Sequence, residues 1–248
     1  MSLPRPLHAL TAAAVAVAVT LGTAGLAATA APAQDLPSAD QLKAALLTVN
    51  DLGPGYTEAP AGSPSPSPGE NPAPVSGCDA LSALINQHAN ASPTPATPHA
   101  EVELDGQDGN PVVTENLTAE DPGKLTTDFN TATDALKTCH RITFTADTGD
   151  SVTFDVTPIT LGDRPDAPAV RLDGTLAGVQ LNACIGIERF GTVAMVFGFF
   201  QREGSSSQLA SMQYRTVVAK VEHTLGTTAG STTPPAPPAT QGTAVAFQ

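Results

Sequence analysis

The sequence predicts an α+β fold, in which an antiparallel β-sheet of about six strands packs with helices in a single domain. Apolar and polar residues alternate over 179–187, a period of two that is typical of a strand with one buried face. Two shorter alternating segments follow each other between 141 and 157, as in a hairpin. Apolar residues recur at helical spacing over 121–139 and again over 207–225. Strands and helices of these kinds together indicate one sheet covered by helices.

A long hairpin over 178–201 is predicted to lie at the centre of the sheet. Phe190-Gly191 is expected to form its turn. From Thr192 to Phe200 the odd-numbered and the even-numbered positions are both apolar, as in a strand buried on both faces. A membrane span is the rival interpretation of so apolar a stretch. It is disfavoured, because polar residues leave far fewer than the roughly 18 uninterrupted apolar residues that a span requires. These residues are Asn182, Glu188, Arg189 and Gln201.

Further strands are predicted before this hairpin. The residues from Val102 to Leu117 form a hairpin around the turn 105–110, whose acidic residues lack the ligand spacing of an EF-hand loop. Strands follow at 141–146 and 151–157, and Val170 and Leu172 mark one more.

Helices are predicted at both ends of the domain. A capping box begins a helix over 39–48, and a second helix begins after Gly77-Cys78-Asp79 and ends near Gln87. The last helix has Ser207 as its N-cap and ends at Gly226. Within it, Met212 and Tyr214 are assigned to the core rather than to a ligand site.

The two ends of the chain are expected to lie outside the domain. Residues 1–33 have the pattern of a secretory signal peptide, with Arg5 before an apolar stretch and Ala31-Pro32-Ala33 at the cleavage point. An uncleaved membrane anchor is the alternative. The predicted domain then spans 34–226, with Pro-rich loops at 60–76 and 89–98, and the Thr/Pro/Ala-rich tail 227–248 is expected to be disordered.

The net charge of the chain is -13, which argues against binding to nucleic acid or to anionic lipid. Solubility outside the cell accounts for this acidity, and an acidic docking surface is the alternative. With the signal removed, no stable membrane insertion is expected. The composition, with Arg above Lys and abundant Ala, Thr and Pro, is typical of a GC-rich bacterial genome.

The sequence contains no pattern that indicates catalysis or a cofactor. G-x-S-x-G, the dinucleotide fingerprint and the phosphate-binding loop are all absent, so no catalytic residue and no cofactor is predicted. The histidines after the signal are His88, His99, His140 and His223. His88 and His99 flank a Pro-rich loop without a third ligand, so no metal site is predicted.

Three cysteines follow the signal segment: Cys78, Cys139 and Cys184. Outside the cytoplasm disulfides persist, which predicts one pair and one remaining cysteine. Cys139 and His140 are adjacent and point apart, so Cys139 is interpreted as half of a structural disulfide rather than as a reactive thiolate.

The order of these features resembles actinobacterial exported proteins of the PknH-like extracellular sensor-domain family. The resemblance rests on the segment Leu46-Leu47-Thr48-Val49-Asn50-Asp51-Leu52-Gly53-Pro54-Gly55-Tyr56, on the helix that Cys78-Asp79 opens, and on the helix that ends at Cys139 before Ile142-Thr143-Phe144. It covers roughly Leu36 to Leu225. It implies an antiparallel sheet packed with helices around a cleft and held by disulfides.

The resemblance implies that Cys78 and Cys139 pair. The chain shows no kinase, no lipobox and no fourth cysteine, so Cys184 matches half of a second disulfide without its partner. A buried free thiol is the preferred interpretation of Cys184, and an intermolecular bridge is the alternative.

The function expected from these observations is an exported, sensor-like, non-enzymatic domain of the cell envelope. It would bind a small or envelope-derived ligand in a cleft between sheet and helices, through residues that the sequence does not identify. A structural or protein-interaction module of the envelope is the alternative. An envelope hydrolase would need a histidine, an acid and a nucleophile that converge.

Overall fold

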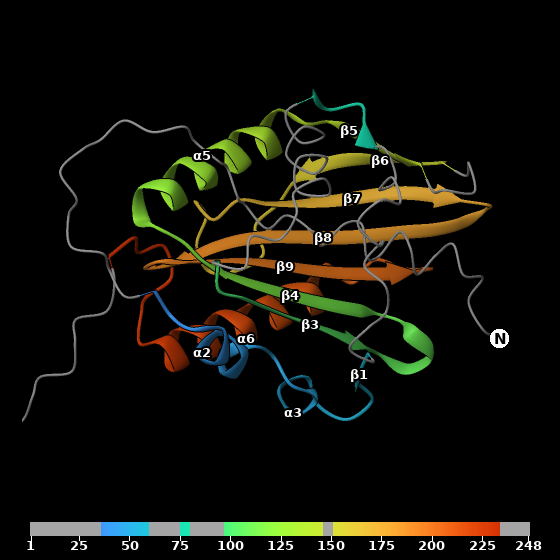
Figure 1. Ribbon diagram of the computed structural model, residues 1–248. Coiled ribbons are helices and arrows are strands. Elements are labelled where there is room, and N and C mark those ends of the chain that lie inside the picture. Colours follow the sequence, from blue (N-terminus) through green and yellow to red (C-terminus); the bar gives the residue numbers. More distant parts are fainter. Residues whose placement is uncertain (1–35, 60–74, 80–96, 146–150, 234–248) are drawn as a thin grey trace, which may run out of the picture.

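A computed structural model describes residues 36–59, 75–79, 97–145 and 151–233 (Figure 1). Its strands form one antiparallel sheet in the order β1-β3-β4-β9-β8-β7-β6-β5-β2. The predicted α+β class is confirmed, but about six strands is too few, because nine are present in the described residues. Two of these, β1 (Thr57–Glu58) and β2 (Val75–Ser76), are two residues long and add to the two edges of the sheet. Strands so short have no periodicity that a sequence pattern can reveal.

The longer strands have the following bounds: β3 His99–Asp105, β4 Val112–Ala119, β5 Arg141–Thr145, β6 Ser151–Pro158, β7 Ala169–Leu176, β8 Val179–Phe190 and β9 Val193–Arg202. The helices are α2 Ala39–Ala45, α3 Val49–Leu52, α5 Pro122–Thr138 and α6 Ser207–Leu225, and a 3-10 turn, Gln107–Gly109, joins β3 to β4.

The predicted central hairpin is confirmed as β8 and β9, which lie between β7 and β4 (Figure 1). Both faces of β9 are buried, as its pattern predicted. The prediction that β8 has only one buried face is wrong beyond its first residues. Cys184 and Glu188, which alternate with the apolar residues and were expected to face water, are also buried. The helix α6 packs on this second face of β8 and removes these side chains from water.

Helices cover the sheet on both faces, so two apolar clusters form. On one face α5 packs over the strands from β5 to β9, and on the other α2 and α6 pack over the strands from β3 to β9 (Figure 1). Alternate residues of β9 divide between them, with Val196 in the α5 cluster and Met195 and Phe197 in the α6 cluster. Successive side chains of β9 point to opposite faces of the sheet and therefore belong to different clusters.

The helix expected over 39–48 ends earlier, at Ala45, and a second short helix, α3, follows it over Val49–Leu52. The capping box of Ser38 and Gln41 is confirmed, but Leu46 is extended and the chain turns before α3 begins. The backbone N–H of Leu47 donates instead to the Glu115 carboxyl group of β4, at 2.7 Å. This long-range hydrogen bond takes a donor that a continuous helix would use internally, and it was not predictable from local pattern.

The last helix is confirmed with small corrections. Its N-cap is Ser206 rather than Ser207, and Gly226 ends it in the left-handed conformation. Tyr214 is buried as predicted, whereas Met212 is 57% exposed and the prediction of a core role for it is wrong. Residues two apart on a helix lie on nearly opposite sides, so only one of the two faces the sheet.

The domain extends beyond the predicted boundary at residue 226. Ala229 is buried, and both it and Ser231 form β-bridges with Phe190. Ser231 also accepts a hydrogen bond from the backbone N–H of Gly191, at 2.7 Å. The beginning of the predicted disordered tail therefore packs against the hairpin turn.

Several predictions concern residues outside the described ones: the signal segment 1–33, most of the second helix, most of both Pro-rich loops, His88, and residues 234–248. The predicted loop 60–76 is described only at its end, where β2 forms. Within the described ranges, no helix has the length and apolar character to cross a membrane.

Candidate functional site

A cavity of about 250 Å³ lies between α6, the loop that follows β6, strand β8 and the segment after α6. Its walls carry charged and aromatic side chains as well as apolar ones. The lining residues are Gly162, Asp163, Arg164, Glu188, Tyr214, Arg215, Val218, Ala219, Glu222 and Ala229.

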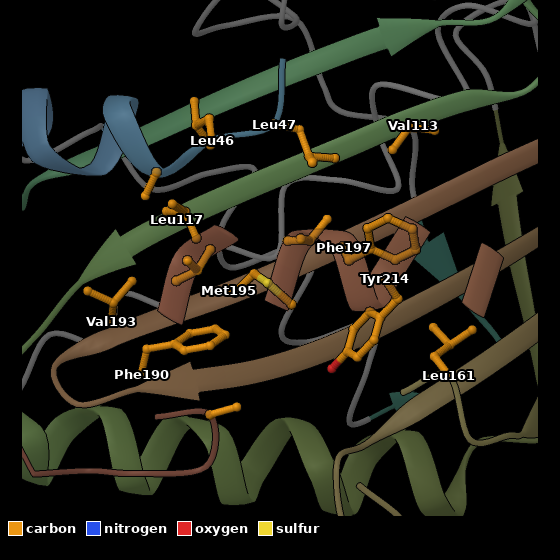
Figure 2. Close-up of a cluster of buried hydrophobic side chains, with 14 of the residues drawn as sticks. Leu46, Leu47, Val113, Leu117, Leu161, Phe190, Val193, Met195, Phe197 and Tyr214 are labelled. Atoms are coloured by element: carbon orange, nitrogen blue, oxygen red, sulfur yellow. The ribbon is translucent and has the colours of Figure 1, made fainter. Parts of the chain in front are cut away.

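Tyr214 of α6 forms the aromatic part of the wall. Its ring lies against strand β8 at Gly186, where an added Cβ would be 2.5 Å from the ring, and against Gly162, where it would be 2.9 Å away. Phe197 of β9 meets the ring edge-on, with centroids 5.5 Å apart (Figure 2). Two glycines thus let α6 bring an aromatic ring directly onto the sheet.

The Tyr214 hydroxyl is buried and has no hydrogen-bond partner in the described part of the chain. Burial raises the pKa of Tyr214, and the nearby carboxyl group of Glu188 raises it further. The hydroxyl therefore stays protonated and can both donate and accept a hydrogen bond. A buried polar group beside a cavity calls for a partner, either a water molecule or a ligand group.

Glu188 and Arg164 form an ion pair at the base of the cavity. The Nε of Arg164 is 3.3 Å from Oε2 of Glu188, and the backbone N–H of Arg189 donates to Oε1 at 3.2 Å. Only 1% of Glu188 is exposed, and burial raises its pKa above the ordinary value, although the Arg189 N–H and the Arg164 guanidinium oppose this rise.

Arg164 also holds the segment after α6 in place. Its Nη1 donates to the carbonyl of Ala229 at 2.9 Å, and its Nη2 donates to Asp166 at 2.7 Å. Gly230 has a φ of +79°, and any Cβ there would collide with the guanidinium. From the other side, Oε1 of Glu222 accepts the backbone N–H of Ala229 at 2.8 Å. These contacts hold Ala229 in the wall of the cavity.

At the rim, Arg215 donates to Asp163 at 2.9 Å, and both side chains are more than half exposed. The cavity thus passes from an exposed ion pair to one whose carboxyl group is buried while its arginine is partly exposed. Such a gradient is typical of a site in which a few polar groups fix a small ligand against apolar walls.

Three further buried carboxyl groups lie away from this cavity. Glu115 of β4 is fully buried beneath the α2–α3 segment, and burial raises its pKa to about 8. Near the start of α5, Lys124 bridges Glu120 at 2.9 Å and Asp128 at 2.6 Å, and burial raises the pKa of Glu120 to about 7. Glu115 thus ties the α2–α3 segment to β4, and Lys124 ties Glu120, which follows β4, to α5.

The segment Leu46–Tyr56, on which the family resemblance partly rests, is held to α6 by polar contacts. Lys220 forms an ion pair with Asp51, and the Gln213 amide donates to the Tyr56 hydroxyl at 2.5 Å. Because α6 also carries Tyr214 and Glu222, this segment supports the helix that forms one wall of the cavity.

The predicted cysteine residues are placed as follows. Cys78 and Cys139 lie at disulfide-bonding distance, with Cα atoms 5.6 Å apart, at the end of α5. Cys184 is a buried free thiol on the opposite face of the sheet, and burial raises its pKa to about 11. None of the three lines the cavity.

The described histidines do not converge on a nucleophile. His99, His140 and His223 are all exposed: His99 belongs to β3, His140 immediately precedes β5, and His223 belongs to α6. Within the described ranges, no three His, Cys, Asp or Glu side chains gather closely enough to hold a metal ion.

Sequence reasoning did not identify the cavity residues. From the sequence, Glu188 and Arg189 were predicted only to interrupt an apolar stretch, and no role was predicted for Arg164. A charged residue within an otherwise buried strand was the available signal, since such a charge requires a partner. The partner comes from a different part of the chain.

The chain matches no protein-family model, and no curated protein resembles it closely enough to count as a relative.

Proposed function

We propose that this chain is an exported, non-enzymatic domain of the cell envelope that binds a small ligand in the cavity between α6 and the sheet. The observation that carries the proposal is the group of Glu188, Arg164 and Tyr214, because buried polar groups at a cavity wall are costly unless something completes their hydrogen bonds. Its sensor-like role and its kinship with the PknH-like extracellular domains rest on the resemblance of Leu46–Tyr56 and the cysteine pattern.

The charge and the cysteine pair support a location outside the cytoplasm. A net charge of -13 keeps a secreted domain soluble, and a cysteine pair at bonding distance is stable in an oxidising compartment. The N-terminal signal pattern would direct the chain there.

A binding screen tests the proposal. The purified chain would be titrated with envelope-derived sugars, peptides and lipid head groups while its unfolding temperature is followed. A ligand at 100 times its Kd should stabilise the fold by about 2.7 kcal/mol.

The site is tested by filling it. Ala219→Phe places a ring in the cavity wall from an exposed position on α6, so ligand binding should be lost while the fold is kept. Thr224→Phe is the matched control, because Thr224 is exposed on the same helix and does not line the cavity. Equal loss in both variants, or a ligand that binds Ala219→Phe unchanged, would contradict the assignment.

A further inference from the structure

The charges around the cavity restrict what it can bind. Four carboxyl groups lie in its wall or on its arginine, from Asp163, Asp166, Glu188 and Glu222, against two guanidinium groups, from Arg164 and Arg215. Fully ionised, the set carries a surplus of two negative charges. The chain as a whole is strongly acidic as well, so its field repels anions and attracts cations.

The Arg164 guanidinium is already engaged by acceptors of the protein. Arg164 directs Nη1 to the Ala229 carbonyl, Nη2 to Asp166 and Nε toward Glu188. An anionic ligand at Arg164 would have to displace a carboxylate that already pairs with it. The Arg215 side chain is more than half exposed and is held to Asp163 through its Nε.

Carboxyl oxygens, in contrast, remain able to accept hydrogen bonds. Glu222 gives Oε1 to the backbone N–H of Ala229, and its other oxygen accepts no hydrogen bond from the described residues. Glu188 contacts Arg164 through Oε2, although the Nε of Arg164 lacks the geometry of a hydrogen bond to it. Negative charge is therefore in surplus in the walls, and carboxyl oxygens are open to a donor.

A metal ion does not fit this arrangement. Hard cations are held by several oxygen ligands at close range, and no group of three candidate ligands exists among the described residues. An ammonium group fits, since it offers three donors and one positive charge to two carboxyl groups and a tyrosine hydroxyl.

We propose that the cavity binds a small organic cation with a primary ammonium group, held by Glu188 and Glu222. This inference rests on the proposed ligand-binding function and adds the chemical class of the ligand. Either a free amine or an amino sugar could supply this group.

The test is a calorimetric titration with three ring compounds of matched size: cyclohexylamine, cyclohexanol and cyclohexanecarboxylate. Only the amine should bind, and its affinity should fall as salt is added, because salt screens charge pairs. Glucosamine and glucose repeat the comparison on a sugar ring. Comparing glucosamine with cyclohexylamine then separates an amino sugar from a simple amine as the source of the ammonium group.

The variants Glu222→Gln and Glu188→Gln assign the site. Each keeps the shape of the side chain and an acceptor oxygen, and each should weaken amine binding at least about tenfold, which corresponds to about 1.4 kcal/mol. Glu222→Gln is the primary variant, because Glu222 is only partly buried and its replacement can still accept the Ala229 N–H. Glu101→Gln, on the exposed side of β3, removes the same charge elsewhere and should leave binding unchanged.

The possible failures are distinguishable. If the alcohol or the carboxylate binds as tightly as the amine, and Ala219→Phe abolishes that binding, the cavity is a ligand site and the amine class is wrong. If the amine binds both glutamine variants as it binds the unmodified chain, the assignment to Glu188 and Glu222 is overturned. If neither these probes nor the envelope panel binds, the proposed function itself fails.

Discussion

Glu115 offers a test of how the fold handles a buried carboxyl group. Its side chain is fully buried in β4, one oxygen accepts the Leu47 N–H at 2.7 Å, and the other has no partner in the described part of the chain. Burial raises its pKa to about 8, with the Leu47 N–H and Lys220 acting in the opposite direction. The folded protein therefore keeps a proton on Glu115 that the unfolded chain releases above a pH of about 4.5.

The sign of the pH effect follows from this difference. Between pH 4.5 and pH 8 the folded state binds more protons, so the free energy of unfolding falls as pH rises, by up to about 1.4 kcal/mol for each pH unit. Glu115→Gln has no proton to lose and its amide oxygen can still accept the Leu47 N–H. Relative to the unmodified chain, the variant should gain about 3 kcal/mol of stability between pH 5 and pH 7.5.

Urea unfolding at a series of pH values measures this difference. The control is Glu101→Gln, whose side chain is exposed in the folded state, so its difference from the unmodified chain should stay nearly constant with pH. A difference for Glu115→Gln that is equally flat would mean that Glu115 is ionised in the folded protein, and the account of its burial would be refuted.

Three further predictions concern other parts of the fold. Replacing Cys78 and Cys139 with serine should cost about 4 kcal/mol by the chain-entropy relation for a separation of 61 residues, measured by urea unfolding; an unmodified chain whose unfolding midpoint is indifferent to reductant would show that the bond is absent. Gly186→Ala should destabilise the fold by roughly 1–3 kcal/mol, because the new methyl group meets the Tyr214 ring, and adding Tyr214→Leu should recover part of the loss; no loss in the single variant would show that the ring lies elsewhere. Glu120→Gln should flatten the fall in stability with rising pH between about 4.5 and 7, because burial raises the pKa of Glu120 to about 7; an unchanged pH profile would show that Glu120 does not hold that proton.

The sheet was predictable where the chain repeats a local period. Alternation along 179–187 and the apolar run from Thr192 placed the central hairpin correctly, and helical spacing placed α5 and α6. These patterns record which side chains avoid water, and that is a local property of strands and helices. The two-residue strands at the sheet edges are too short to show such a pattern.

The cavity was not predictable, because its residues meet only through tertiary packing. Glu188 lies on the polar parity of β8 and becomes buried when α6 packs there, and its partner Arg164 comes from a loop 24 positions earlier. The wall at Ala229 belongs to a segment whose composition indicated disorder. Gly186 alternates with the apolar residues of β8, and its lack of a side chain is what admits the Tyr214 ring.

The most direct measurement is a map of backbone amide shifts by nuclear magnetic resonance as cyclohexylamine is added to the purified chain. The account predicts that the changes gather in three separate segments, at 161–164, 186–189 and 219–222, and that Ala219→Phe suppresses them together. Changes confined to the opposite face of the sheet, around α5, or no changes at saturating amine, would contradict it.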